Sequence, residues 1–257
     1  MHHTLEFPDL LRLIDERSAV FRAAIAAAPS LDVQVPTCPE WTLFDLAQHI
    51  GVGRRSWAAT VAAGPDATAK VQAEGVAPRE REALLAWLAE STQELVDALR
   101  EAGPDRGCWT WWDGSQSPRT CGAVARHQLQ EIAVHTYDAQ LTVGATEPLP
   151  EEVALDGAEE FLFTCCAMPV AWPYEPAVVD YHTVEGRSWR QWCGADGLRV
   201  ARLSVPSSPA GEVVDVSVEG AASDLVLQFY GRLPLDSLKL DGDRRVLELL
   251  IAWDPSQ

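Results

Sequence analysis

Basic residues are scarce in this sequence of 257 residues. Lys and Arg number 20 against 38 Asp and Glu, which leaves a formal charge of −18 at pH 7. A chain this acidic repels phosphate backbones unless it carries a local basic patch. The arginines at 54–55, 79–81 and 244–245 are scattered and lie beside acidic residues. We therefore expect no nucleic-acid partner.

Long apolar runs are absent as well. No uninterrupted stretch approaches the roughly 20 residues that span a bilayer. The hydrophobic content of 47% is typical of a globular protein and too high for a disordered one. The N-terminal residues show no basic segment followed by an apolar core, the pattern of a secretory signal. We expect a cytoplasmic protein without a membrane partner, long enough for one large domain or two ordinary ones.

The motif Cys-x-x-Cys is also missing. Without a secretory signal or dense, regular cysteine spacing, neither a disulfide scaffold nor a cysteine zinc cluster is indicated. We expect reduced thiols that pack as small apolar groups, with none of them binding a metal. The six cysteines are Cys38, Cys108, Cys121, Cys165, Cys166 and Cys193.

Apolar residues at helical spacing, interrupted by Gly and Pro, predict helices in the first part of the chain. Thr42 is the expected N-cap of the second helix, and Gly-Pro pairs at 64–65 and 103–104 end the second and third. Long helices with short breaks are typical of an up-and-down bundle. The predicted helices cover about residues 10–28, 43–63, 78–102, 122–143 and 151–167.

The pattern changes after about residue 169. Partial alternation predicts short strands, and two short helices follow them, which is typical of a small α+β domain with an antiparallel sheet. The predicted strands are 178–184, 188–193, 198–203 and 213–218, and the predicted helices are 223–230 and 244–253. The expected fold class is α+β, with a four-helix bundle in residues 1–168 and a small antiparallel α+β domain in residues 169–257.

The fourth predicted helix carries an unusual polar face. Glu131 and His135 lie one turn apart on it, so a carboxylate oxygen and an imidazole nitrogen can converge on one cation at about 2.0–2.2 Å from each. Taken alone, the pair favours the ordinary alternative, a solvated stripe on an amphipathic helix. It is not the His-Glu-x-x-His of metalloproteases either. The polar face consists of His127, Gln128, Glu131, His135, Asp138 and Thr142.

A third ligand has to come from elsewhere. His127 lies two turns from His135, roughly 12 Å along the helix axis, too far for both to bind one ion without strain. A ligand from another helix is geometrically easier. His49 is the other histidine in a predicted helix. The ordinary alternative for His49 is a histidine hydrogen-bonded to a neighbour within the core.

Two sequence motifs together resemble those of a known family. Residues 37–42 read Thr-Cys-Pro-Glu-Trp-Thr and are followed by Asp45, Leu46 and His49, and residues 126–139 place an arginine before Glu-x-x-x-His and an aromatic residue and Asp after it. Both are similar to signatures of the mycothiol-dependent maleylpyruvate isomerase family, a branch of the DinB-like helical bundles. Residues 220–232 and 241–243 resemble the small C-terminal domain of that family.

The resemblance implies a site and a chemistry. It makes His49, Glu131 and His135 the ligands of a divalent metal, normally zinc, with mycothiol as the thiol cosubstrate. It also places Arg232 near the carboxylate of the substrate as a catalytic residue; the alternative is an arginine facing a helix dipole. The implied function is the addition of a metal-activated thiolate to a small electrophilic substrate, by a thiol S-transferase or a maleylpyruvate-type cis–trans isomerase.

Other interpretations stay open at this point. The metal of such a site can activate water instead, which gives a hydrolase of a small molecule, or the chain can be a non-catalytic, metal-containing protein that binds a small molecule. Asp138 is expected behind the ligands or in helix packing. Three of the ten tryptophans, Trp109, Trp111 and Trp112, either fill the core between helices or form the wall of a pocket above the metal.

Overall fold

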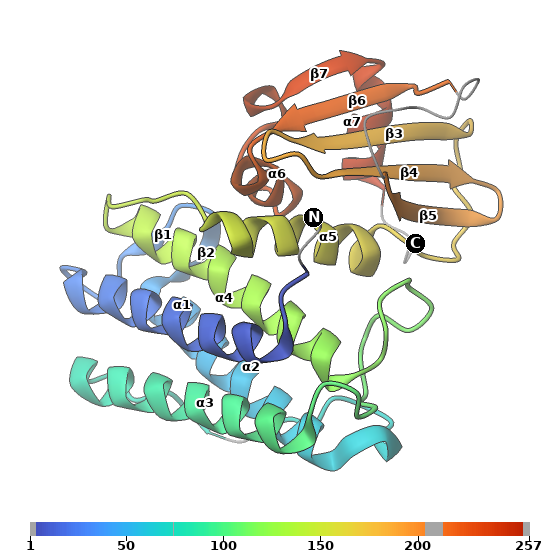
Figure 1. Cartoon of the computed structure of the whole chain (residues 1–257). Helices are drawn as coiled ribbons and strands as arrows, with labels where there is room; N and C mark the ends of the chain where they lie inside the picture. The colour runs from blue at the N-terminus through green and yellow to red at the C-terminus, as the bar shows by residue number, and fades with distance from the viewer. Residues whose placement is uncertain (1–3, 74, 204–212, 254–257) are drawn as a thin grey trace. The chain divides into compact units, whose positions relative to one another are not determined.

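The computed structural model places the chain in two compact units (Figure 1). It describes residues 4–73, 75–203 and 213–253. The described residues of the first unit are 4–73, 75–113 and 118–157, and those of the second are 114–117, 158–203 and 213–253. The division falls inside the helix α5 (Glu151–Cys165), whereas the expected domain boundary follows that helix, at residue 168. A continuous helix carries no turn signal that would mark such a division.

The first unit is a bundle of long helices, as predicted. Helix α1 packs against α3 and α4, and α2 packs chiefly against α3. Fully buried leucines and isoleucines such as Ile14, Leu88 and Leu129 fill the space between the helices. The long helices are α1 (Phe7–Ala27), α2 (Leu43–Ala63), α3 (Arg81–Ala102) and α4 (Cys121–Thr142), with a short 3-10 helix, η1 (Gly64–Asp66), after α2.

Helix α2 begins at a capping box, which confirms the predicted N-cap. The Thr42 hydroxyl accepts a hydrogen bond from the Asp45 amide at 3.3 Å, and the Asp45 carboxylate accepts one from the Thr42 amide at 2.9 Å. Hydrogen bonds from the Thr42 hydroxyl and amide lower the pKa of Asp45. The residues before the cap form a small hairpin that was not predicted, β1 (Gln34–Val35) and β2 (Cys38–Thr42).

Two glycines of α2 provide a matched test of this packing. A Cβ atom on Gly51 would lie 1.9 Å from the ring of Trp87, whereas a Cβ on Gly53 would have no atom within 4 Å. We expect Gly53→Ala to raise the free energy of unfolding by about 0.5–1 kcal/mol, because alanine restricts the unfolded chain and favours the helix. Gly51→Ala should lower it by about 1–3 kcal/mol, because Trp87 must move. Urea unfolding followed by circular dichroism measures both, and equal changes at the two positions would contradict the packing.

The second unit is a five-stranded sheet with helices. Its strand order is β5-β4-β3-β6-β7, and all neighbours are antiparallel except β3 and β6, which are parallel, so the sheet is mixed. The predicted strand at 213–218 begins only at Val216, and β7 was not predicted. The strands are β3 (Ala177–Thr183), β4 (Ser188–Gly194), β5 (Gly197–Arg202), β6 (Val216–Gly220) and β7 (Lys239–Gly242). The unit also contains the end of α5, α6 (Ala222–Phe229), η2 (Leu235–Ser237) and α7 (Arg244–Ala252).

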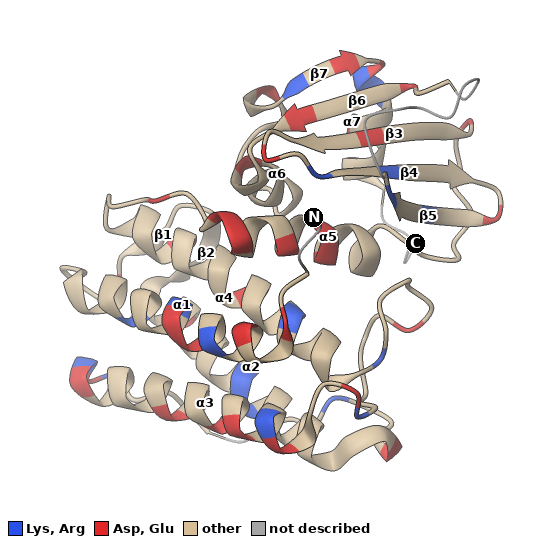
Figure 2. Ribbon diagram, in the orientation of Figure 1, with Lys and Arg blue, Asp and Glu red and all other residues tan. Residues whose placement is uncertain are grey.

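Charged residues are distributed over both units. Figure 2 shows Lys and Arg on helices and strands throughout, many of them near Asp or Glu. Ion pairs such as Arg12 with Glu16 and Arg244 with Glu248 bring basic side chains next to acidic ones. None of the helices formed by the described residues combines the length and the apolar character that crossing a membrane requires.

Candidate metal centre

The structure brings His49, Glu131 and His135 together. His49 extends from α2, and the other two extend from α4, one turn apart; one ligand atom of each lies within 4.8 Å of the others. The Nε2 atom of His49 is 2.8 Å from Oε1 of Glu131, and the Nε2 atom of His135 is 3.8 Å from the same oxygen. The His49 and Glu131 side chains are 38% and 31% exposed, so solvent reaches the cluster.

The donor atoms fit a small divalent ion. Nitrogen and oxygen ligands about 2.0–2.2 Å from a tetrahedral zinc ion are about 3.4 Å apart. The two nitrogen–oxygen distances in the cluster, 2.8 and 3.8 Å, bracket that value. Small side-chain adjustments would therefore seat an ion among these three atoms. Three protein ligands on one side, with solvent on the other, leave a coordination position for a small molecule.

Glu131 is ionised at neutral pH. Burial raises the pKa of its carboxyl group, but the hydrogen bond with His49 and the charges of His135, His127 and His49 outweigh burial and lower it to about 2. A carboxylate between two imidazoles supplies one negative charge to the cluster. This negative charge would attract a divalent cation to the cluster.

A buried carboxylate orients His135 from behind. With its proton on Nδ1, His135 donates a hydrogen bond to Oδ2 of Asp138 at 2.8 Å, which leaves the Nε2 lone pair on the side of Glu131. Asp138 is fully buried, and its other oxygen accepts a hydrogen bond from the Thr37 hydroxyl at 2.6 Å. Such a carboxylate fixes the tautomer and the ring orientation of a metal-binding histidine.

Cys38 lies closer to the site than its expected packing role requires. Its sulfur is 3.9 Å from Oδ2 of Asp138, and Cys38, His135 and Asp138 form a second group whose ligand atoms lie within 4.8 Å of one another. Both oxygens of Asp138 already accept hydrogen bonds, from Thr37 and His135. We therefore interpret Cys38 and Asp138 as residues that orient His135 through hydrogen bonds rather than as a second metal site.

Trp41 was not singled out from the sequence, although it lies in one of the motifs. Its ring centroid is 4.7 Å from that of His49 and 6.1 Å from that of His135. The two histidine rings lie 5.2 Å apart and nearly perpendicular. The indole therefore covers one side of the cluster and restricts the approach of water and ligands there.

In the tryptophan-rich segment, the expected core role holds for Trp112, and the role as the wall of a pocket above the metal stays a prediction. Trp112 is 3% exposed and belongs to the core, whereas Trp111 is 49% exposed. Both rings contact His127, at 5.2 and 5.5 Å between centroids, and Trp57 lies 6.2 Å from it. His127 is one helical turn before Glu131, so this group forms an aromatic surface next to the cluster. His127 is not itself part of the cluster, as the helical rise predicted.

Arg232 lies just after α6, in the second unit. Its Nη1 atom donates a hydrogen bond to the Tyr230 carbonyl at 2.7 Å, at the C-terminal end of that helix. This contact matches the alternative in which the arginine faces a helix terminus. A role for Arg232 toward a substrate carboxylate stays a prediction.

The fold and the cluster together define a two-domain bundle protein with a candidate metal centre between two of its helices. Two protein-family models match this chain. The model described as the mycothiol maleylpyruvate isomerase N-terminal domain matches residues 11–140, and the model described as the MDMPI C-terminal domain matches residues 152–249. The chain belongs to the mycothiol maleylpyruvate isomerase family. The resemblance inferred from the two motifs is thereby confirmed, and so is the expectation of an enzyme.

Solved structures agree with this assignment at the level of the fold. Crystal structures of the mycothiol-dependent maleylpyruvate isomerase and of a point mutant of it each match with a TM-score of 0.56 and 14% identity, over 92% of this chain and 93% of the other. The expected α+β fold class is confirmed. No curated protein matches this chain.

Proposed function

We propose that this chain is a zinc- and mycothiol-dependent enzyme that adds a thiol to a small electrophilic substrate, as an S-transferase or a cis–trans isomerase. The observation that carries the proposal is the group His49, Glu131 and His135 in a member of this family. A divalent ion held there lowers the pKa of a bound thiol and so supplies a nucleophilic sulfur at neutral pH.

The residues around the cluster have separate tasks in this proposal. Glu131 offsets part of the charge of the ion, and Asp138 holds the ring of His135 in place. The exposed ring of Trp111, which meets His127 edge to face, offers an apolar surface for the electrophile. In the proposal, Arg232 pairs with a carboxylate of the substrate and stabilises the negative charge that develops after thiol addition.

The six cysteines support a cytoplasmic location. All six are free thiols in the structure, as expected for a reducing compartment. The nucleophilic sulfur of the proposed reaction comes from mycothiol rather than from the chain. Burial raises the pKa of Cys193 to about 12, which keeps that thiol protonated and unreactive.

The test combines metal analysis with a thiol assay. Purified protein should contain about one equivalent of zinc or a similar ion. Incubation with mycothiol and monobromobimane should give enzyme-accelerated adduct by mass spectrometry, and incubation with maleylpyruvate distinguishes an isomerase from a transferase. Acceleration of neither reaction, with hydrolysis of an ester or amide instead, would favour the hydrolase. A protein that binds no metal and accelerates nothing would refute the proposal.

Asp138→Asn tests the support behind His135. The amide cannot accept hydrogen bonds on both atoms as the carboxylate does, and it removes the charge that favours the Nδ1 proton. We expect zinc affinity to fall by about 10–100-fold with little change in circular dichroism. Competition with a chromophoric chelator measures it. Thr37→Ala, which removes only the outer hydrogen bond, is the matched control and should cost less; unchanged affinity in Asp138→Asn would contradict the orienting role.

A further inference from the structure

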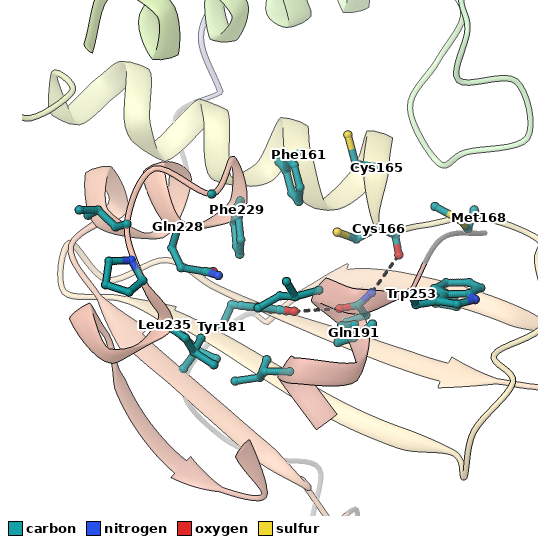
Figure 3. Close-up of a pocket in the computed structure, with 18 residues that line it drawn as sticks. Phe161, Cys165, Cys166, Met168, Tyr181, Gln191, Gln228, Phe229, Leu235 and Trp253 are labelled. Atoms are coloured by element: carbon teal, nitrogen blue, oxygen red, sulfur yellow. Dashed lines mark hydrogen bonds between the residues drawn. The ribbon is translucent and has the colours of Figure 1, made fainter. Parts of the chain in front are cut away.

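The second unit contains a cavity of about 450 Å³ that takes no part in the metal cluster (Figure 3). Its walls are the C-terminal half of α5, strands β3 to β6 of the sheet, and helices α6 and α7. We propose that this cavity is a binding site for a neutral, largely apolar small molecule that has a flat ring or short chain and one hydrogen-bonding group. Cavities of about 300–1,000 Å³ are typical of such sites.

An aromatic wall gives the cavity its shape. The rings of Phe161 and Phe229 stack at 4.9 Å with an angle of 10° between their planes, and Tyr181 meets Phe229 edge to face at 5.5 Å. Phe161 and Phe229 come from two different helices and both stay partly exposed. A ring or alkyl chain placed against this wall would bury apolar surface at about 25 cal/mol for each Å² removed from water.

The polar atoms of the sheet at the cavity are satisfied within the protein. The Tyr181 hydroxyl donates a hydrogen bond to Oε1 of Gln191 at 2.9 Å, and Nε2 of Gln191 donates one to the Cys166 carbonyl at 3.0 Å, as the dashed lines in Figure 3 show. An apolar ligand would therefore leave neither of these groups without a partner. This part of the cavity favours hydrocarbon.

The charge of the ligand follows from the lining. None of the described residues that line the cavity is Asp, Glu, Lys or Arg. Burial raises the pKa of the Cys166 thiol to about 12 and that of Tyr181 well above its usual value, so both stay neutral. An ionised ligand would lose its hydration without gaining a counter-charge, which is costly. The occupant is therefore a neutral molecule.

Gln228 is the group that can hold a polar atom of the ligand. Its side chain extends between Phe229 and Tyr181 in Figure 3, and within the described part of the chain its amide makes no hydrogen bond. The amide both donates and accepts, so one hydroxyl, amine or carbonyl on the ligand can pair with it.

Apolar side chains of helix α7 at the cavity remain partly exposed to solvent. Leu247 is buried, but Leu250 on the cavity side is only half-buried and Ile251 is 62% exposed. Leu250 and Ile251 both line the cavity. A ligand in the cavity would complete their burial, which is the source of the expected affinity.

Titration of the full chain with aminoanthracene, a neutral fluorescent amine, tests the site. We expect saturable one-to-one binding and weaker binding of the anionic probe anilinonaphthalenesulfonate. Leu250→Trp fills the cavity and should weaken aminoanthracene binding about tenfold or more, equivalent to about 1.4 kcal/mol. Glu248→Trp puts the same side chain on an exposed position of α7 outside the cavity and should leave binding unchanged. Gln228→Leu should weaken aminoanthracene but not anthracene.

Several results would overturn the inference. They are the absence of saturable binding, equal binding by the Leu250→Trp and wild-type proteins, or equal affinity for the anionic and neutral probes. If Leu250→Trp loses its circular dichroism signal, Leu233→Trp fills the same cavity from the loop after α6. If gel filtration showed a dimer and the dimer did not bind the probe, the apolar surface at the cavity would be an interface with a second copy of the chain instead. Metal content and thiol addition are measured separately, so failure here leaves the proposed function untouched.

Discussion

Glu131→Gln should remove the metal from the purified protein and abolish thiol addition. The amide has nearly the same size as the carboxylate. It lacks the negative charge that Glu131 supplies between the two imidazole rings. We expect metal content to fall from about one equivalent to near zero. The rate of adduct formation should fall by about 10³-fold or more, because the activation of the thiol is lost with the ion. Elemental analysis and the mycothiol assay measure the two effects.

Glu94→Gln is the matched control for this experiment. Glu94 is an exposed carboxylate on α3 that pairs with Arg55 at 3.1 Å, so the same substitution there changes a surface charge alone. Its metal content and rate should equal those of the wild type. If Glu131→Gln retained one equivalent of metal, the ion would have to be held elsewhere and the assignment of the cluster would be wrong. His49→Ala should repeat the loss from the other helix.

The long elements could be predicted from the sequence because local signals marked both ends of most of them. Thr42 and the Gly-Pro pair at 64–65 bound α2 in the sequence and in the structure. The hairpin of β1 and β2 could not be predicted from the sequence, since β1 has two residues and β2 contains Pro39 and Glu40, which are depleted in strands. Alternation along β3 and β6 reveals two strands but does not reveal that they pair in parallel.

The candidate site was predictable to a similar extent. Helical periodicity places Glu131 and His135 on one face, and the resemblance adds His49 from another helix. The contacts of Thr37 and Cys38 with Asp138 depend on the unpredicted hairpin, which brings residues about 100 positions apart into contact. The cavity of the second unit was not predicted either, because its wall combines residues of α5, of four strands and of two C-terminal helices that only the folded chain brings together.

Asp180→Ala should be the most destabilising single substitution considered for the second unit. Asp180 and Arg190 are cross-strand partners on β3 and β4, and both are almost completely buried. The guanidinium donates two parallel hydrogen bonds to the carboxylate, at 2.6 and 2.8 Å. Removing the carboxylate takes these two charge-assisted hydrogen bonds away from a buried guanidinium, at a cost of about 3–5 kcal/mol. Urea unfolding of the full chain, followed by circular dichroism and tryptophan fluorescence, measures the loss.

Glu219→Ala is the matched control, because Glu219 and Lys239 are also cross-strand partners, on β6 and β7, but are exposed. Their ion pair, at 2.9 Å, should contribute at most about 1 kcal/mol, since solvent screens it. If Asp180→Ala lowered the free energy of unfolding no more than Glu219→Ala, burial would not determine how much the Asp180–Arg190 pair contributes to stability. The double variant Asp180→Val with Arg190→Leu should regain much of the lost stability, because it removes both charges and replaces them with apolar side chains suited to a strand. Recovery in the double variant would show that the penalty comes from the buried guanidinium that has lost the Asp180 carboxylate rather than from the loss of the Asp180 side chain itself.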